Sequence, residues 1–239
     1  MKNAECPYAW KASPFSSHGR ILAQLLRLPR DRRILDVGAA TGYLGSALRQ
    51  AGFHSVSGIE MNPEWAREAK PFYQSLEVCD LERDPLPWEE GSFDVLICAD
   101  VLEHLKDPAG VLRRLQGLLA AGGMGLVSLP NVAHWSVRLS LLFGRFSYEP
   151  AGILDKSHLR FFTRSTACAL LRQAGLRIQS IAPIPLPVDR WQGNPFGRRL
   201  TKLFERFDYG MGRLLPGLFA FQILFTARAE QSRDAGYSP

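Results

Sequence analysis

Three acidic side chains follow apolar segments of the chain, each at or just past the point where its segment ends. They are Glu60, Asp80 and Asp100. Short apolar segments that alternate with helical patterns predict parallel strands, and the carboxyl ends of such strands form the ligand-binding edge of an open α/β sheet. We therefore expect these carboxylates to lie at one edge, where they can accept hydrogen bonds from a ligand.

A glycine loop precedes the three acids and joins an apolar strand to a helix. Residues 36–43 read Asp-Val-Gly-Ala-Ala-Thr-Gly-Tyr. Gly38 and Gly42 let the backbone approach a ligand that a Cβ atom would exclude, and the helix N-terminus offers amides to an anionic group. In doubly wound folds, an acid roughly 20 residues after the glycines binds the ribose hydroxyls, and Glu60 stands at this distance. The loop predicts a nucleotide cofactor.

Together, the loop and the acids resemble class I S-adenosylmethionine-dependent methyltransferases, strongly over about residues 30–130 and more weakly elsewhere. The resemblance implies S-adenosylmethionine as cofactor and S-adenosylhomocysteine as product, with Glu60 on the ribose and Asp80 near the adenine amino group. The family often has Gly or Cys at position 40, and we expect the small Ala40 to be tolerated. A dinucleotide motif would need glycines at positions 40 and 43, which disfavours NAD. The cofactor residues predicted in this way are Asp36, Gly38, Ala39, Ala40, Gly42, Tyr43, Glu60, Met61, Asp80, Leu81 and Ala99.

The segment that ends the fourth predicted strand carries the first candidate catalytic groups. Asp100, Glu103 and His104 resemble the E-x-x-E-H run of ubiquinone-pathway O-methyltransferases, whose acids and histidine have been associated with a divalent metal. These residues could hold magnesium through waters, His104 could accept a hydroxyl proton, or the run could be structural. Methyl transfer needs a base only when the nucleophile starts protonated. We favour a structural role over a metal site and predict no resident metal.

A second histidine lies in the run His-Leu-Arg-Phe-Phe-Thr at residues 158–163. This run resembles many bacterial small-molecule methyltransferases, including ones associated with surface polysaccharide pathways. His158 could act as a base or bind substrate, and Arg160 could hold an anion. Alternatively, Asp155, His158 and Thr163 only fix the position of a lid. The predicted catalytic candidates are His104, His158 and Asp100.

Seven strands and several capped helices are expected to position these groups. The resemblance implies a Rossmann-like doubly wound α/β fold, with a mostly parallel seven-stranded sheet of order 3-2-1-4-5-7-6 and helical lid insertions. Ser16 or Ser17 is predicted to cap one helix, and Thr163 to cap another. A further helix should begin at Asp107-Pro108, bury Leu118 and Leu119, and end at Gly122-Gly123. The predicted strands are 34–37, 55–59, 75–78, 93–98, 124–129, 176–181 and 219–227.

We predict a single methyltransferase domain over residues 1–239. It is divided into an N-terminal cap (1–30), a cofactor-binding core (31–130), a substrate lid (131–165), a basic aromatic insertion (185–216) and a flexible tail (229–239). In the cap, Tyr8 and His18 are candidate cofactor contacts or merely packed side chains. In the lid, aromatic residues such as Trp135 and Phe146 could enclose an apolar or ring-bearing acceptor.

The positive charge of the chain is concentrated in its second half. Residues 131–228 hold 14 basic and 5 acidic side chains, a net charge of +9, whereas residues 1–130 hold 14 and 16, a net charge of −2. An anionic acceptor, nucleic acid or an acidic membrane surface would each suit the arginines, and so would an ordinary solvated surface. For the insertion, peripheral membrane contact is one alternative, but we favour a helix that packs on its own domain or on a second subunit.

Composition and motifs together favour one function. The four cysteines are scattered, which argues against a zinc site or a disulfide framework, and neither a signal peptide nor a membrane span is expected, so we predict a cytoplasmic protein. The predicted activity is S-adenosylmethionine-dependent methyl transfer to a small molecule, with O-methylation favoured. A nucleic-acid methyltransferase is disfavoured because the sequence lacks an N-P-P-Y motif and a separate RNA-binding module. A non-catalytic methyltransferase-like partner protein is the other alternative.

Overall fold

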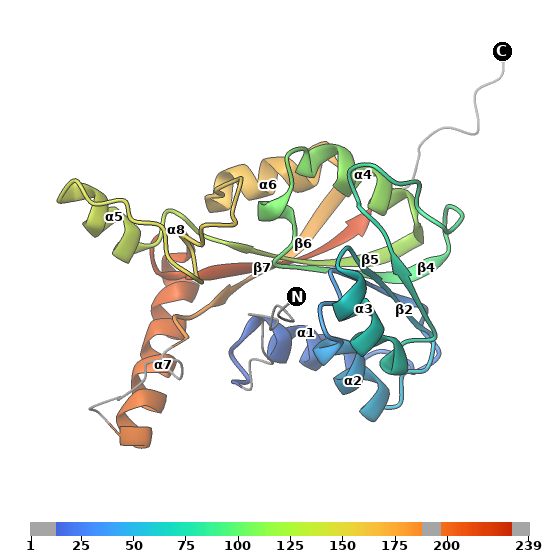
Figure 1. Ribbon diagram of the computed structural model, residues 1–239. Coiled ribbons are helices and arrows are strands. Elements are labelled where there is room, and N and C mark those ends of the chain that lie inside the picture. Colours follow the sequence, from blue (N-terminus) through green and yellow to red (C-terminus); the bar gives the residue numbers. More distant parts are fainter. Residues whose placement is uncertain (1–12, 188–196, 231–239) are drawn as a thin grey trace, which may run out of the picture.

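The protein folds around one mixed sheet with helices on both faces (Figure 1). The computed structural model describes residues 13–187 and 197–230, so Tyr8 lies outside the described residues. The strand order is β3-β2-β1-β4-β5-β7-β6, which confirms the predicted order and fold class. The first five strands pair in parallel, and β7 pairs antiparallel with both β5 and β6. The strands are β1 (Ile34–Val37), β2 (Val56–Glu60), β3 (Ser75–Val78), β4 (Phe93–Ala99), β5 (Leu119–Pro130), β6 (Leu176–Ile184) and β7 (Gln222–Ala229).

Two apolar clusters cover the two faces of the sheet. Successive side chains of a strand point to opposite faces, so Leu35 and Val37 join one cluster while Ile34 joins the other. The first cluster includes side chains of α4 (Pro108–Gly117) and α6 (Arg164–Gln173), and the second includes those of α1 (Ser17–Leu25) and α2 (Tyr43–Gln50). Figure 1 shows these two helix pairs on opposite sides of the sheet. The remaining helices are α3 (Pro63–Ala69), α5 (Trp135–Leu142), α7 (Gly197–Leu214), α8 (Pro216–Phe219), and the 3-10 turns η1 (Lys70–Phe72) and η2 (Leu102–His104).

Helix starts follow the predicted caps. The Ser16 side chain accepts from the Gly19 amide at the start of α1, and the Asp107 side chain accepts from the Gly110 amide at the start of α4. At α6, Thr163 forms a reciprocal capping box with Thr166. Because each cap satisfies an amide that the helix itself leaves unpaired, these three starts could be located from local sequence.

Two element boundaries differ from the prediction. Helix α4 ends at Gly117, and Leu119 already pairs with Phe93 in the sheet, so the prediction that this helix continues to Gly122-Gly123 was wrong. The last strand begins at Gln222 instead of residue 219, because Pro216 starts the short helix α8. The predicted tail also begins too early, since Ala229 pairs with Leu176 in the sheet. At Leu119 and Ala229, pairing across the sheet decides the boundary, and a local pattern does not reveal that pairing.

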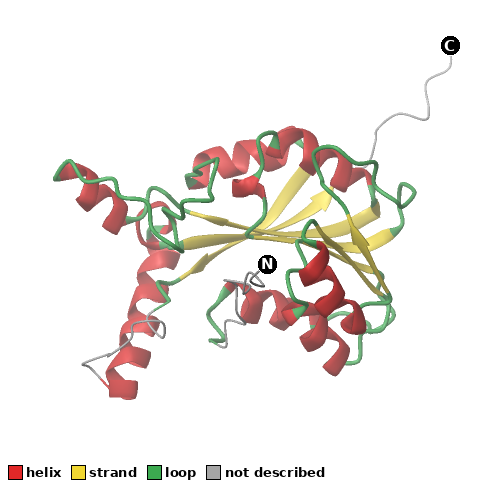
Figure 2. Cartoon of the chain, in the orientation of Figure 1, coloured by secondary structure: helices red, strands yellow, loops and turns green. Residues whose placement is uncertain are grey.

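The loops at the carboxyl ends of the parallel strands position the site. Figure 2 shows loops before and after α5, in the part of the chain that leads from β5 to α6. Within the described residues, no helix combines the length and apolar character that crossing a membrane requires.

Candidate active site

One large cavity opens at the carboxyl ends of β1, β2 and β4. Its volume is about 1220 Å³. The glycine loop lines one part of it, and the segments at 149–155 and 184–187 line another. Every predicted cofactor residue except Gly42 lines this cavity, and so do Asp100, His104 and His158. The structure therefore brings nearly all of the predicted site residues to one place.

The glycine loop has three residues in left-handed backbone conformations. The φ angles are +75° at Gly38, +47° at Ala40 and +86° at Gly42. Alanine is strained in this region, where glycine is not. The strained peptide is held in place, because the Ala40 amide donates to Glu60 Oε2 at 2.8 Å. The loop thus tolerates the departure from the family pattern at position 40.

Gly42 supports packing and does not line the cavity. A Cβ atom at this position would lie 2.9 Å from Ala69 Cα and 2.8 Å from Phe72 Cδ2. At Gly38, a Cβ atom would lie 2.6 Å from Val101 Cγ2. Both glycines therefore make room for the protein's own chain, and the expected role of Gly42 in cofactor approach stays a prediction.

The two acids expected to bind the nucleoside are already engaged by backbone amides. Glu60 Oε2 accepts from Ala40, and its Oε1 accepts from the Asn62 amide at 2.9 Å. Asp80 Oδ1 accepts from the Glu82 amide at 2.9 Å, and its Oδ2 lies 3.5 Å from Arg83 Nε. Each carboxylate oxygen can accept more than one hydrogen bond. These contacts fix the orientation of both acids and leave capacity for a ligand.

Asp36 lies buried beneath the glycine loop. The Tyr73 hydroxyl donates to Asp36 Oδ2 at 2.6 Å. Burial raises the pKa of Asp36 to about 7; the Tyr73 hydrogen bond lowers it, and the charge of Glu60 raises it further. The site consequently contains a carboxyl group that exchanges its proton near neutral pH.

Asp100 is held by two neighbouring strands. It follows β4 in a left-handed conformation with φ +58°. Its Oδ1 accepts from Ser128 Oγ of β5 at 2.7 Å and from Gln222 Nε2 of β7 at 2.8 Å. Sequence reasoning missed both partners, because a predicted strand order gives the neighbouring strands but not the polar side chains that meet across them. The only available signal was that Ser128 and Gln222 stand near strand ends.

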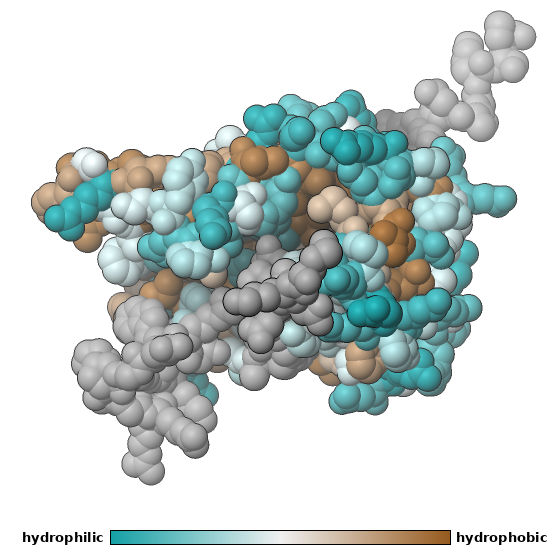
Figure 3. All heavy atoms as spheres, in the orientation of Figure 1, coloured by the Kyte–Doolittle hydropathy of each residue, from teal (hydrophilic) through white to brown (hydrophobic). Residues whose placement is uncertain are grey.

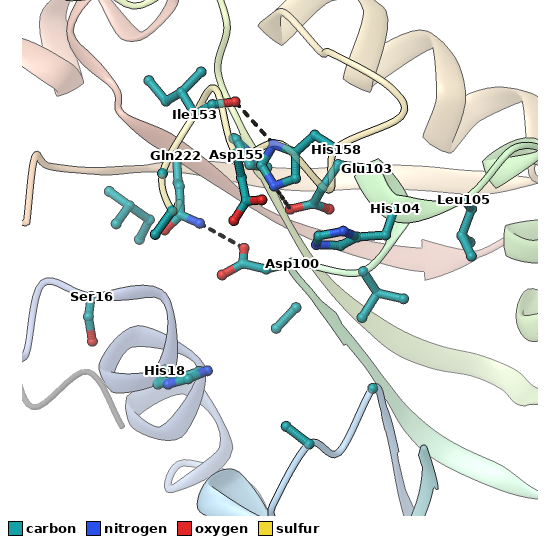
Figure 4. A pocket seen from close by; sticks show the side chains of 18 of the residues that line it. Ser16, His18, Asp100, Glu103, His104, Leu105, Ile153, Asp155, His158 and Gln222 are labelled. Carbon is teal, nitrogen blue, oxygen red and sulfur yellow. Dashed lines mark hydrogen bonds and ion pairs between the residues drawn. The ribbon is translucent and has the colours of Figure 1, made fainter. Parts of the chain in front are cut away.

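One carboxylate and two imidazoles come together in the cavity (Figure 4). They belong to Glu103, His104 and His158. Glu103 Oε1 lies 3.9 Å from His158 Nε2, and the two imidazole rings are 4.9 Å apart between centroids. The amides of Leu159 and Arg160 donate to the Glu103 carbonyl at 2.8 and 3.0 Å. These backbone bonds place the loop that carries His158 against η2, so two distant segments share one site.

Hydrogen bonds to carbonyl groups define the tautomer of both histidines. His158 Nδ1 lies 3.0 Å from the Ile153 carbonyl, and His104 Nδ1 lies 3.2 Å from the Ser157 carbonyl. Because a carbonyl oxygen only accepts, Nδ1 carries the hydrogen in each neutral ring, and Nε2 carries the lone pair. Burial lowers the pKa of His158, against the raising effect of the Ile153 hydrogen bond. His158 is therefore a neutral imidazole near pH 7.

The three groups also suit a metal, but in a different set from the one that the E-x-x-E-H resemblance implies. One ligand atom from each of Glu103, His104 and His158 lies within 4.8 Å of the others. Asp100 is not part of this group and is bonded to Ser128 and Gln222 instead. Two imidazoles and one carboxylate suit zinc or iron better than magnesium, which prefers oxygen ligands. The donor set fits a transition metal.

The predicted lid contributes different residues from those expected. Neither Trp135 nor Phe146 lines the cavity, although Val137 and Ser140 of the same segment do. Phe146 packs against Phe161 at 5.9 Å between ring centroids instead. Arg160 likewise does not line the cavity, because its guanidinium donates to the Lys106 carbonyl. The apolar character of the segment did not show which side chains face inward.

Other predicted residues have roles at the edge of the site. His18 of α1 lines the cavity, opposite the two catalytic histidine candidates in Figure 4. Asp155 Oδ1 accepts from the amide and hydroxyl of Ser157, which fixes the turn before His158. Thr163 caps α6 and lies outside the cavity lining. The alternative that these residues only fix the position of the lid therefore suits Asp155 and Thr163. His158, in contrast, also lines the cavity.

The fold and site define an S-adenosylmethionine-type methyltransferase, and comparison with known proteins agrees. A family model described as "Methyltransferase domain" matches residues 13–181. The chain belongs to this methyltransferase family, as the sequence predicted.

Relatives and solved structures are similar to the chain over much of its length. The ubiquinone biosynthesis O-methyltransferase of Aeromonas salmonicida (strain A449) is 28% identical over 161 residues, which cover 64% of this chain and 66% of the relative. The chain thus spans just under two thirds of that relative. An S-adenosylmethionine-dependent methyltransferase from Mesorhizobium loti shares the fold with a TM-score of 0.59 and 17% identity, over 89% of this chain and 98% of the other. The Burkholderia thailandensis 1,6-didemethyltoxoflavin-N1-methyltransferase, whose structure contains S-adenosylhomocysteine, has a TM-score of 0.56 and 17% identity, over 90% and 77%.

Proposed function

We propose that this protein transfers the methyl group of S-adenosylmethionine to a hydroxyl oxygen of a small molecule, with His158 as the base. The observation that carries the proposal is the neutral imidazole of His158, which lines the same cavity as the expected cofactor loop and bonds to the Ile153 carbonyl through Nδ1, so that Nε2 is the nitrogen with the lone pair. The similarity to ubiquinone biosynthesis O-methyltransferases supports oxygen as the acceptor atom.

The cofactor would occupy the part of the cavity formed by the glycine loop. Glu60 would accept from the ribose hydroxyls while its amide bonds keep it oriented, and Asp80 would accept from the adenine amino group. Ala99 and the backbone of the glycine loop would border the methionine part. The alignment of these groups along one cavity supports this assignment.

The acceptor would occupy the part of the cavity nearest the two histidines. Apolar side chains dominate the wall there, including Ile153, Leu154, Ile184, Leu186 and Phe221. Such a wall favours a ring-bearing or otherwise lipophilic molecule over a nucleic acid. The cavity volume also exceeds the upper part of the range of small-molecule sites, about 1,000 Å³, so it has room for both ligands.

In the proposed reaction, the acceptor oxygen gains a methyl group and loses its proton. As the acceptor oxygen forms its bond to the methyl carbon, the carbon–sulfur bond of the sulfonium breaks, and the hydroxyl proton moves to His158 Nε2. The products are the methyl ether, S-adenosylhomocysteine and an imidazolium. Glu103, 3.9 Å away, would stabilise the positive imidazolium.

A metal-assisted version of the same reaction is the second candidate, favoured by the arrangement of Glu103, His104 and His158. These three side chains would hold a divalent ion. When bound, such an ion would lower the pKa of the acceptor hydroxyl. Chelator treatment of the purified protein, followed by metal analysis and repeated turnover, distinguishes this version from a histidine base.

The first prediction tests the base directly. Methyl transfer to a panel of phenols and catechols would be followed by release of S-adenosylhomocysteine. His158→Ala should lower turnover by about 100-fold or more, because a positioned base contributes about that much. Since burial holds the pKa of His158 below 6.5, wild-type turnover should fall only as the pH is lowered through that depressed pKa, and the variant should lack this acid limb.

Arg160→Ala is the matched control, because Arg160 lies two residues away in the same loop, does not line the cavity, and donates from its guanidinium to the Lys106 carbonyl. It should keep near-normal turnover. Cofactor affinity should be unchanged in both variants. Normal turnover of His158→Ala at low and high pH, or methylation of amines alone, would contradict the proposal.

We also retain the cytoplasm as the proposed location. In the described part of the chain, Cys79, Cys98 and Cys168 are free thiols. Free thiols suit a reducing compartment.

A further inference from the structure

Two helices and the residues that follow them expose most of the large apolar side chains that are exposed in the described residues. Sixteen large apolar or aromatic side chains are exposed there, and twelve of them lie in two segments, 135–148 and 203–215. We call these two segments the apolar face. Its most exposed members include Leu142, Phe143, Leu203, Phe207 and Leu214, with exposed fractions of 62% to 78%. Concentration of this kind is unusual on a surface that only contacts water.

The first segment exposes apolar side chains on more than one side of α5. Among the residues of α5, only Val137 is buried, whereas Leu139, Leu141 and Leu142 are exposed. Figure 3 shows the resulting apolar projection at the left edge of the molecule. Exposed apolar side chains of a helix are stabilised when an apolar partner covers them.

The second segment is amphipathic in a different way. Leu203, Phe207 and Leu214 follow one another at intervals of four and seven residues, so they share one face of α7. On another face, Asp208 is buried and accepts from the Leu186 amide at 2.8 Å. The helix therefore anchors to the protein through one side and leaves an apolar stripe on another.

Both segments border the same cavity. Ser136, Val137 and Ser140 of α5 line it, and so does Glu205 of α7. Both helices extend from one side of the molecule in Figures 1 and 2. Contact along the apolar face would consequently place the acceptor part of the cavity close to whatever covers these helices.

The charges select the kind of partner. Arg138, Arg145, Arg206 and Arg213 are the exposed charged side chains within the two segments. Of the two acids in these segments, Asp208 is buried and Glu205 accepts from Ser13. The nearest exposed acid, Glu149, lines the cavity. A second copy docked face to face would bring arginine against arginine, whereas anionic lipid head groups would complement all four.

We propose that the apolar face docks onto an anionic lipid bilayer, with the leucine and phenylalanine side chains inserted at the interface and the arginines on lipid phosphates. Long arginine side chains can extend to the head groups while apolar neighbours insert more deeply. The inference does not depend on the proposed methyl acceptor.

Flotation with vesicles tests the docking. The wild-type protein should float with vesicles that contain phosphatidylglycerol, should remain unbound with phosphatidylcholine alone, and should lose binding as salt is raised. Leu142→Glu and Phe207→Glu should each weaken binding by at least about tenfold, since each places a charge where an apolar side chain would insert. The matched control is Leu26→Glu, which changes an exposed leucine outside the apolar face and should bind as wild type does.

The substitutions alter exposed positions, so the fold should persist, and thermal unfolding with cofactor affinity would check this. A polarity-sensitive fluorophore attached through Leu142→Cys or Phe207→Cys should shift to the blue on vesicle addition, whereas one attached through Leu26→Cys should not. Absence of binding to anionic vesicles, equal binding by all three glutamate variants, or loss in only one apolar-face variant would overturn the proposal. A wild-type dimer that both variants dissociate, without vesicle binding, would show that the face joins two copies instead.

Discussion

At the scale of single residues, Glu60 links the shape of the glycine loop to the predicted ribose contact. Its carboxylate accepts from Ala40 and Asn62, and it lines the cavity. Glu60→Ala should weaken S-adenosylmethionine binding by about 1.5 to 3 kcal/mol for each charged hydrogen bond lost. Isothermal titration calorimetry measures the loss directly.

Glu64→Ala gives a matched comparison, because it removes the same charge from an exposed residue of α3 outside the cavity. Its affinity should remain close to wild type. Equal affinity for the Glu60 and Glu64 variants, with both proteins folded, would remove Glu60 from the cofactor site.

Asp36 provides a prediction about stability and pH. Its pKa is about 7 in the folded protein and 3.8 ordinarily, so between these values the folded state keeps a proton that the unfolded state releases. The free energy of unfolding should therefore fall as the pH rises from about 4 to 7, by an amount on the order of a few kcal/mol. Asp36→Asn should lose this part of the pH dependence.

Urea unfolding of the cofactor-free protein at pH 5 and pH 8 checks the effect, with the change in each protein compared. Other titrating groups contribute to both proteins and cancel in the difference. Parallel changes in wild type and variant would show that Asp36 does not carry the shift.

At the scale of elements, Gly42 lies where the start of α2 packs against α3 and η1, and this close packing leads to a prediction about stability. Gly42 and Gly52 have almost the same φ, +86° and +87°. An added Cβ would meet the Ala69 backbone at 2.9 Å in the first case, but only Arg30 Cδ at 3.9 Å in the second. Both alanine substitutions introduce the same backbone strain, but only Gly42→Ala also introduces a steric clash. The free energy of unfolding of Gly42→Ala should therefore be lower than that of Gly52→Ala by about 1 to 3 kcal/mol.

Thermal unfolding of the two variants measures this difference. Equal destabilisation would mean that α3 moves aside without loss, and that the glycine is needed only for its backbone conformation. A selective loss of cofactor affinity without loss of stability would instead assign Gly42 to the ligand.

Local sequence was sufficient to predict elements whose signals are themselves local. The caps at Ser16, Asp107 and Thr163 follow from side-chain chemistry within one turn, and the acids at strand ends follow from alternation of apolar segments. The end of α4 was wrong because Leu119 is apolar in either a helix or a strand, and its pairing with Phe93 decides between them. Trp135 and Phe146 were mistaken for cavity residues because apolar character alone gives no direction.

At the scale of the whole molecule, β7 connects a late segment of the sequence to Asp100 of the site. Gln222 donates to Asp100 across 122 positions of sequence, in a contact that sequence reasoning did not find. Gln222→Ala should lower the free energy of unfolding by about 1.5 to 3 kcal/mol, because it removes a hydrogen bond to a partly buried charged group.

Gln50→Ala is the control, since Gln50 donates to Ser46 in an exposed neutral pair. It should change stability by no more than about 0.5 kcal/mol. Equal effects in urea unfolding would show that the Asp100 contact contributes nothing beyond an ordinary surface amide.

The position of β7 also determines when the cavity can form during synthesis of the chain. The ribosome makes β6 before β7, yet β6 pairs only with β7 in the described sheet, and β7 supplies Gln222 to Asp100. A nascent chain that has exposed the glycine loop, the three strand-end acids, His104 and His158 therefore still lacks Phe221 and Gln222, which line the cavity. Translation must pass residue 222 before this cavity lining is complete, so the strands that carry the glycine loop can assemble before the cavity does.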